Sequence, residues 1–177
     1  HLDQKKAVIY EQLLGELEPK GVRLINFNKL SEKEGQDLEK YFDHEIAPYL
    51  SANIISKQQP FPFIKNRDIY AVAQLETNKG KLKLAVVPCS KNVFPRLISI
   101  PTRVGTFMLS EELILHFMPK IFKKYTLKEK SLVRVIRSAD IDTESNYDEY
   151  LEYREIMEYL IKQRKRIAGN LDRYFSY

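Results

Sequence analysis

The sequence has 177 residues, of which 44% are hydrophobic and 30% are charged, and its net charge at pH 7 is +5. With 11 Tyr and 9 Phe it has enough apolar side chains for one sizeable core, which excludes a disordered tail. No apolar run approaches the roughly 20 residues that span a bilayer, and residues 1–20 lack the apolar centre of a signal peptide, so we expect no membrane span and no export.

The first fifty residues are predicted to form two helices separated by a short β-prone stretch. Apolar residues at mixed three- and four-residue spacings predict a helix over 2–18, ended by the Pro-Lys-Gly triplet that follows. Residues 22–27 are β-prone. Ser31 and Glu34 form a Ser-x-x-Glu pattern that is typical of a helix start, and Pro48 marks the end of that second helix. The face expected to be buried carries Leu38, Tyr41, Phe42, Ile46 and Tyr49.

The middle of the chain has the pattern of an antiparallel sheet. A proline- and aromatic-rich connector covers 51–68. The runs 69–76 and 81–87 flank a Thr-Asn-Lys-Gly turn and predict a β-hairpin, and the alternation in its second strand predicts one solvated face. Two further strands are expected at 97–100 and 104–109.

Two helices and one strand are expected in the remainder of the chain. Ser110, followed by two glutamates, is interpreted as a helix start. The run 132–136 predicts a strand with Arg134 pointing outward, and a long helix is expected over about 147–166. Together these elements predict a single α+β domain with a mostly antiparallel sheet flanked by helices.

Familiar catalytic and nucleotide-binding motifs are missing. The six glycines have neither the spacing of a phosphate-binding loop nor that of a dinucleotide fingerprint. His44 is predicted to be solvated and His116 to lie at the edge of the core, and no second His or Cys completes a zinc site. The carboxylates of 140–158 are interpreted as an exposed helix face, and no serine has the setting of a nucleophile.

Charge is distributed in blocks. Residues 120–137 contain seven basic residues and one glutamate, whereas residues 140–158 contain eight acidic residues and one arginine. A run of spaced cations is able to follow a polyanion, but such blocks are also typical of ordinary solvated faces.

Seven segments define a framework along the chain. They are EIAPYL at 45–50, QPFPFI at 59–64, IYAV at 69–72, LAVVP at 84–88, FPRLI at 94–98, FMLSEELI at 107–114 and VRVIRSADI at 133–141. In order and spacing they resemble segments of the polyphosphate kinase family that carries phospholipase-D-like catalytic domains. The resemblance extends over roughly 2–168, and residues 168–177 match poorly. Departures are Ser51 and Ala52 in place of Thr-Pro, Gln59 in place of His, and Ser138 in place of Asn.

The resemblance implies that residues 1–177 are the middle, or head, domain of such an enzyme. The parent chain would then transfer the terminal phosphoryl group of ATP reversibly to polyphosphate through a phosphohistidine, with ATP and magnesium as its cofactors. In that family the nucleophilic histidine lies downstream, and none of His1, His44 and His116 begins a His-x-Lys element. We therefore expect this piece to hold no catalytic residue, to bind no cofactor or metal by itself, and to be inactive alone.

The resemblance also implies partners and a location. The family's head domain contributes to dimer contacts and borders the tunnel for nucleotide and polyphosphate, so we expect the partners to be other domains of the same chain and a second copy. Polyphosphate is a further expected partner. The candidate tunnel residues are Lys123, Lys124, Lys128, Lys130, Arg134 and Arg137. The lone Cys89 fits a reducing cytoplasm, and membrane association is left open as a property of the parent enzyme.

Two alternatives remain. The positive charge and the many Tyr and Phe residues are compatible with a stand-alone nucleic-acid-binding module, although most aromatics lie on apolar helix faces rather than on a strand platform for stacking bases. A hydrolase that uses the carboxylates of 140–158 would lack a nucleophile. Nucleic acid is therefore not the partner we expect.

Overall fold

The structure is a computed structural model that describes residues 2–55, 62, 64–90 and 92–134. The helical elements in this part are α1 (Leu2–Leu17), η1 (Glu18–Lys20), η2 (Phe27–Lys29), α2 (Glu32–Tyr41), η3 (Phe42–Ile46), η4 (Ala47–Tyr49) and α3 (Ser110–Ile121). The strands are β1 (Arg23–Leu24), β2 (Asn53–Ile54), β3 (Ile69–Glu76), β4 (Leu82–Pro88), β5 (Leu97–Ser99), β6 (Thr106–Leu109) and β7 (Thr126–Arg134). The expected helix over 147–166 lies outside the described residues.

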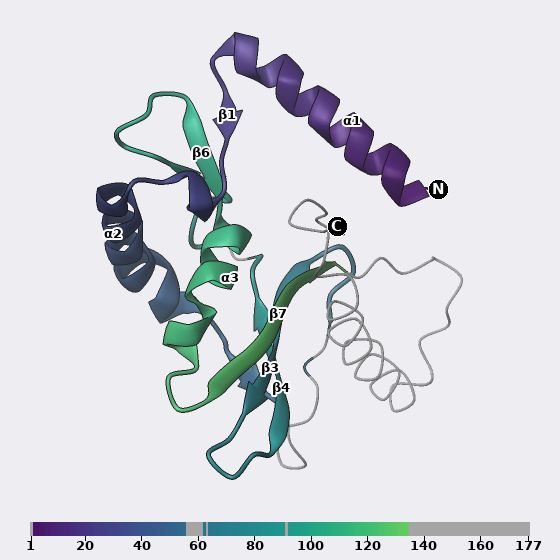
Figure 1. Cartoon of the computed structure of the whole chain (residues 1–177), viewed down its shortest axis with the longest axis vertical. Helices are drawn as coiled ribbons and strands as arrows, with labels where there is room; N and C mark the ends of the chain where they lie inside the picture. Colours follow the sequence, from purple (N-terminus) through teal and green to yellow (C-terminus); the bar gives the residue numbers. More distant parts are fainter. Residues whose placement is uncertain (1, 56–61, 63, 91, 135–177) are drawn as a thin grey trace.

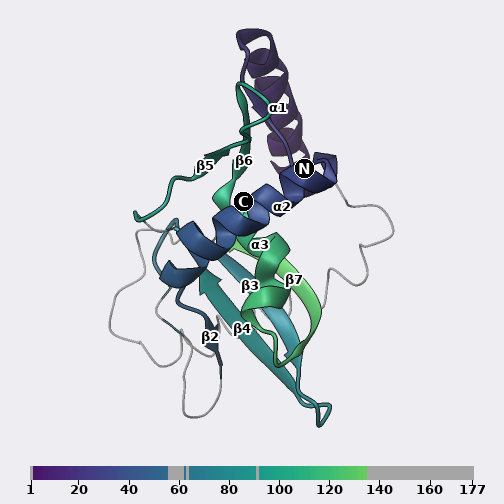
Figure 2. The ribbon, with the colours of Figure 1, turned by 90° about the vertical axis from the view of Figure 1, so that its left-hand side faces the viewer.

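Two sheets organise the domain. The larger is antiparallel with strand order β2-β4-β3-β7, and the smaller has the order β1-β6-β5, in which only β1 and β6 run parallel. α2 and α3 lie over one face of the larger sheet (Figures 1 and 2). The prediction of an α+β domain with a mostly antiparallel sheet flanked by helices is confirmed.

The larger sheet is buried on both faces. One face packs under α2, η3 and α3 through buried side chains such as Ala73, Leu113 and Met118. The other face carries Tyr70, Val72, Leu84, Val86 and Val133, which pack with Ile55 and Ile64 from the connector between β2 and β3. The predicted solvated face of the hairpin is therefore wrong over most of its length. The alternation along the second strand assigns Lys81, Lys83 and Ala85 to the solvated face, but Lys83 is half-buried and Ala85 is fully buried in the cluster under the helices.

The start of α2 follows the predicted capping pattern. The Ser31 hydroxyl accepts a hydrogen bond from the Glu34 backbone N–H at 3.3 Å, and the Ser31 N–H donates to Glu34 Oε2 at 2.8 Å. The helix widens into a π-turn at η3 and ends in η4, which contains Pro48. Tyr49, expected on the buried face, is instead 49% exposed, because the change of helical period rotates it out of register with Leu38 and Phe42.

The starts of two strands differ from the sequence predictions by more than one residue. β7 begins at Thr126, six residues before the predicted strand at 132. Polar residues such as Lys128 and Glu129 interrupt the apolar pattern in its first half, so the sequence does not reveal it. The expected strand at 104–109 begins at Thr106. α3 begins at Ser110, as predicted, and its N-cap Leu109 makes no side-chain cap hydrogen bond.

α1 extends away from the remainder of the described chain (Figure 1). The helix predicted over 2–18 is present as α1, but its apolar side chains Val8, Ile9, Leu13 and Leu17 are exposed. Among the described residues, no helix combines the length and apolar character that a membrane crossing requires.

Candidate functional site

The basic residues proposed for polyphosphate contact lie on β7 and on the turn before it. β7 pairs with β3 along its length, and a β-bulge opposite Gln74 and Leu75 leaves Lys128 as the extra residue. Lys128 makes an ion pair with Glu76 on β3. Because that pair joins neighbouring strands, Lys128 helps to stabilise the pairing of β3 with β7.

Lys130 supplies a hydrogen bond that the backbone of α3 lacks. Pro119 has no backbone N–H, so the carbonyl of Leu115 loses the partner that a regular helix would supply. Lys130 Nζ donates to that carbonyl at 2.8 Å and to the carbonyl of His116 at 3.3 Å. The side chain is half-buried, and burial lowers the pKa of its ammonium group. A lysine that completes a helix in this way is tied to the fold.

Arg134 is exposed at the end of β7, as predicted. Its Nε donates to the carbonyl of Arg67 at 2.9 Å, and Arg67 has a positive φ of 68° in the turn that precedes β3. The contact holds the turn against the strand end. Arg137 lies outside the described residues.

Lys123 and Lys124 differ from the other candidates. Both are exposed on the turn between α3 and β7, and neither makes a hydrogen bond or ion pair with another described residue. Lys120, one turn earlier, is bound by Glu39 at 2.7 Å and by Asp43 at 2.7 and 2.8 Å, which raises the pKa of its ammonium group. The structure therefore separates two freely solvated lysines from a set of basic residues with intramolecular partners.

The two internal histidines have structural contacts. His44 is exposed, and its Nδ1 lies 2.8 Å from the Lys40 carbonyl within the same helix. His116 stacks on Phe27 with ring centroids 3.5 Å apart and packs edge-on against Phe117 at 4.8 Å. Burial, followed by the charge of Lys130, lowers the pKa of His116. Both predicted placements are confirmed, and in the described part no three His, Cys, Asp or Glu residues are grouped as metal ligands would be.

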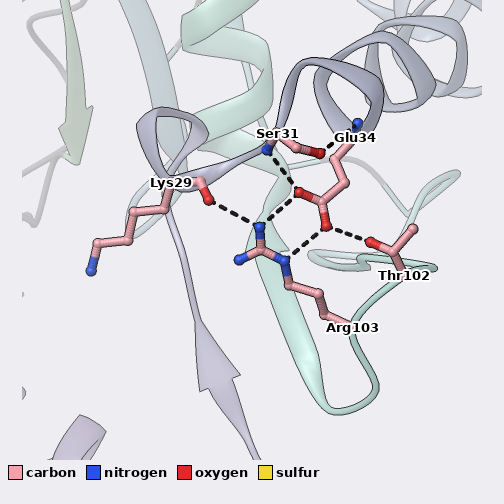
Figure 3. Close-up of polar contacts among 5 residues, drawn as sticks. All are labelled: Lys29, Ser31, Glu34, Thr102 and Arg103. Carbon is pink, nitrogen blue, oxygen red and sulfur yellow. Dashed lines mark hydrogen bonds and ion pairs between the residues drawn. The ribbon is translucent and has the colours of Figure 1, made fainter.

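The most saturated polar cluster joins α2 to the turn between β5 and β6 (Figure 3). Glu34 is 6% exposed and accepts two hydrogen bonds from Arg103, at 2.8 Å each, one from Thr102 and one from the Ser31 N–H. Arg103 also donates to the Lys29 carbonyl at 3.2 Å. These bonds, those from Arg103 first, lower the pKa of Glu34 to about 2. The capping pattern located Glu34, but no local signal pointed to Arg103, which is 69 residues away.

Comparison with known families decides the identity of the framework. The family model described as the polyphosphate kinase middle domain matches residues 33–169. The chain belongs to this family. The match includes all of α2 except its first residue, β3 to β7, α3 and the six candidate polyphosphate-contact residues.

Individual polyphosphate kinases agree with the family match. The chain is 35% identical over 132 residues to a polyphosphate kinase of Lactiplantibacillus plantarum and 33% identical over 138 residues to one of Halalkalibacterium halodurans. These alignments cover 73% and 76% of the chain but only 18% and 19% of the relatives. The chain thus spans about a fifth of the length of the curated relatives that it matches.

A solved structure supports the fold of this middle domain. The polyphosphate kinase from Porphyromonas gingivalis superimposes with a TM-score of 0.68 over 86% of this chain and 26% of its own, at 21% sequence identity. At that identity the similarity establishes the fold.

Proposed function

We propose that the chain is an interior, non-catalytic domain of a polyphosphate kinase. The parent enzyme would transfer the terminal phosphoryl group of ATP reversibly to polyphosphate through a phosphohistidine, with magnesium. This domain would contact the neighbouring domains of the same chain, contribute to a homo-oligomer and form part of the wall of the polyphosphate tunnel. The observation that carries the proposal is the middle-domain match over 33–169 in a chain that spans about a fifth of its relatives.

The contacts of the histidines support a non-catalytic role. A phosphoryl-accepting histidine needs a free ring nitrogen within reach of a bound nucleotide. His116 stacks on Phe27 and packs edge-on against Phe117, and His44 faces its own helix. Neither has a phosphate-binding loop beside it in the sequence.

Phosphohistidine trapping tests this proposal. The full-length enzyme carrying His44→Gln and His116→Gln together is incubated with γ-labelled ATP, and acid-labile, alkali-stable label on the protein is measured. We expect labelling and polyphosphate synthesis within about twofold of wild type, because neither ring accepts phosphate. Loss of the label in a variant whose melting temperature is unchanged would contradict the proposal.

We further propose that Lys123 and Lys124 contact polyphosphate, while Lys128, Lys130 and Arg134 stabilise the neighbouring strand through their intramolecular partners. Arg137 stays a candidate contact that lies outside the described residues. Exposed lysines without intramolecular partners are available to neutralise phosphates, and such contacts weaken as salt rises. The chain also carries exposed lysines elsewhere, at Lys20 and Lys33, which serve as a charge-matched control.

Polyphosphate affinity of the full-length enzyme tests this face. Lys123→Gln with Lys124→Gln is expected to weaken binding about tenfold at low salt and to reduce its salt dependence, since two charge-assisted contacts are lost. Lys20→Gln with Lys33→Gln removes the same charge and is expected to have little effect. Equal affinities for the two double variants would exclude Lys123 and Lys124 as contacts.

A further inference from the structure

A cavity of about 180 Å³ lies beside the first turn of α3. Its walls come from the start of β3, from the segment between β4 and β5, and from α3 itself. The residues that line it include Cys89, Ser90, Phe94, Arg96, Ser110 and Glu111. Burial raises the pKa of the Cys89 thiol to about 12, so this part of the wall is neutral.

Glu111 is the unusual member of this wall. It is only 2% exposed, and its Oε1 accepts two hydrogen bonds from Arg96, at 2.9 Å from Nε and 2.6 Å from Nη2. Its Oε2 has a single contact among the described residues, the Ser110 hydroxyl at 3.5 Å. That distance exceeds the roughly 2.5–3.0 Å of an ordinary O–H···O hydrogen bond. A buried carboxylate oxygen with so weak a contact favours a further donor.

The other walls suit a donor that is partly apolar. The Phe94 ring is buried at 7% exposure and presents an aromatic surface. The Ser90 hydroxyl accepts the Ile69 N–H at 3.2 Å, which leaves it capacity for another hydrogen bond. A carboxylate, two hydroxyls and an aromatic ring around one small space are the groups that recognise an alkylated cation.

Three charged side chains lie at the α3 end of the cavity. Glu111 and Glu112 lie in the first turn of α3, and Arg96 lies beside them with its side chain 60% exposed. Arg96 also lines the cavity, and of the two Glu111 oxygens it bonds only to Oε1, so Oε2 is the oxygen available to a second cation. The pKa of Tyr10 on α1 is raised by burial and next by the charge of Glu112, whereas the charge of Arg96 lowers it.

We propose that this cavity binds a primary alkylammonium group. The ammonium donates to Glu111 Oε2 and to the hydroxyls of Ser110 and Ser90, and its alkyl chain lies against Phe94. At about 30 Å³ for each water-sized group, the cavity holds about six non-hydrogen atoms. A butylammonium group has five.

Two sources supply this chemistry. One is a free aliphatic amine in solution. The other is a lysine side chain from another domain of the parent enzyme, an alternative that rests on the proposed function because it requires the larger chain. The free-amine source is independent of phosphoryl transfer.

Ligand-observed NMR with the full-length enzyme tests the proposal. The enzyme is titrated separately with n-butylammonium and with n-butanol, which has the same size but no charge. We expect saturable binding of the amine, and about tenfold weaker binding of butanol, because only the amine forms a charge-assisted pair with the carboxylate. Glu111→Gln is expected to weaken amine binding about tenfold, and Glu16→Gln on the exposed surface of α1 leaves it unchanged.

A second variant is needed because Glu111→Gln also removes an ion pair that stabilises the fold. Ser110→Ala keeps the Arg96–Glu111 pair and removes one hydroxyl, so it is expected to weaken amine binding about threefold without unfolding the domain.

A zero-length carbodiimide coupling of wild type, read by mass spectrometry, separates the two sources. If a lysine of the parent fills the cavity, added amine does not bind, and Glu111 is coupled to that lysine. If neither amine binding nor coupling at Glu111 is observed, water alone occupies the cavity and the proposal is overturned. Polyphosphate synthesis is measured in parallel, so that failure of the amine site is distinguishable from failure of the proposed enzyme activity.

Discussion

Glu34 shows how one carboxylate joins distant parts of this chain. Its two oxygens accept four hydrogen bonds, from Ser31, Thr102 and twice from Arg103. Four acceptor positions are about what an ionised carboxylate offers, so the group is fully satisfied although it is buried. The cluster anchors the start of α2 to the turn between β5 and β6 (Figure 3).

The acid stability of the 177-residue chain tests this cluster. The pKa of Glu34 in the folded state is about 2, below its ordinary value of 4.5. The ionised carboxylate therefore stabilises the fold at pH values above about 4.5, and this contribution is lost as the pH falls towards 2. Glu34→Gln should lower the melting temperature at pH 7 and flatten its dependence on pH between about 4.5 and 2.

Glu32→Gln is the matched control, because Glu32 lies in the same helical turn but is exposed. It should leave both the melting temperature and its acid dependence close to wild type. An unchanged acid dependence in Glu34→Gln would mean that the cluster does not stabilise the fold.

At the scale of elements, the turn between β5 and β6 lies directly against the turn that ends η1. Gly105 has a φ of 71°, and a Cβ atom placed there would lie 1.9 Å from the carbonyl oxygen of Gly21. The Arg23 N–H donates to the Gly105 carbonyl at 2.8 Å, which begins the pairing of β1 with β6. The parallel pairing in the smaller sheet thus depends on a residue without a side chain.

Alanine substitution separates this close approach from backbone conformation. Gly80 in the hairpin turn has a φ of 73°, but a Cβ atom there would have no neighbour within 4 Å, so its substitution measures conformational strain alone. Gly80→Ala is expected to cost about 1–2 kcal/mol of unfolding free energy. Gly105→Ala is expected to cost at least about 2 kcal/mol more, because the Gly21 carbonyl must move. Urea denaturation of the 177-residue chain measures both, and equal costs would show that the turns are not in close contact.

For the whole molecule, the larger sheet is shared by two apolar clusters. Leu113 on α3 is fully buried on the helical face, and Val86 on β4 is fully buried on the opposite face. Because the same strands carry both clusters, loss of packing on either face should unfold the sheet as a unit.

Calorimetry tests this cooperativity. Leu113→Ala is expected to reduce the free energy of unfolding by about 2–5 kcal/mol and Val86→Ala by about 2 kcal/mol. Both substitutions should lower the temperature of one and the same unfolding transition. Leu13→Ser is the control, since Leu13 on α1 is 52% exposed and should leave that transition unchanged. Two separate transitions, with each substitution shifting only one, would contradict a shared core.

Local patterns were sufficient for most elements and for the family. The capping pair at Ser31 and Glu34, the hairpin around the turn at 77–80 and the helix after Leu109 are each specified by residues close in sequence. The collinear segments from QPFPFI to VRVIRSADI indicated the polyphosphate kinase family in the same way. Periodicity, turn chemistry and short motifs are properties of neighbouring residues, so they can be recognised without knowledge of the fold.

Tertiary packing, in contrast, sets which surfaces are covered and which basic residues are free. The alternation of the hairpin predicted a solvated face at Lys83 and Ala85 because it does not reveal that helices pack over this side of the strand. Lys123 and Lys130 look alike in sequence, yet Lys130 completes α3 across 15 residues and Lys123 faces solvent. Arg103 meets Glu34 through a contact between segments far apart in the chain. Such contacts depend on how the elements pack together, and no pattern of neighbouring residues encodes that packing.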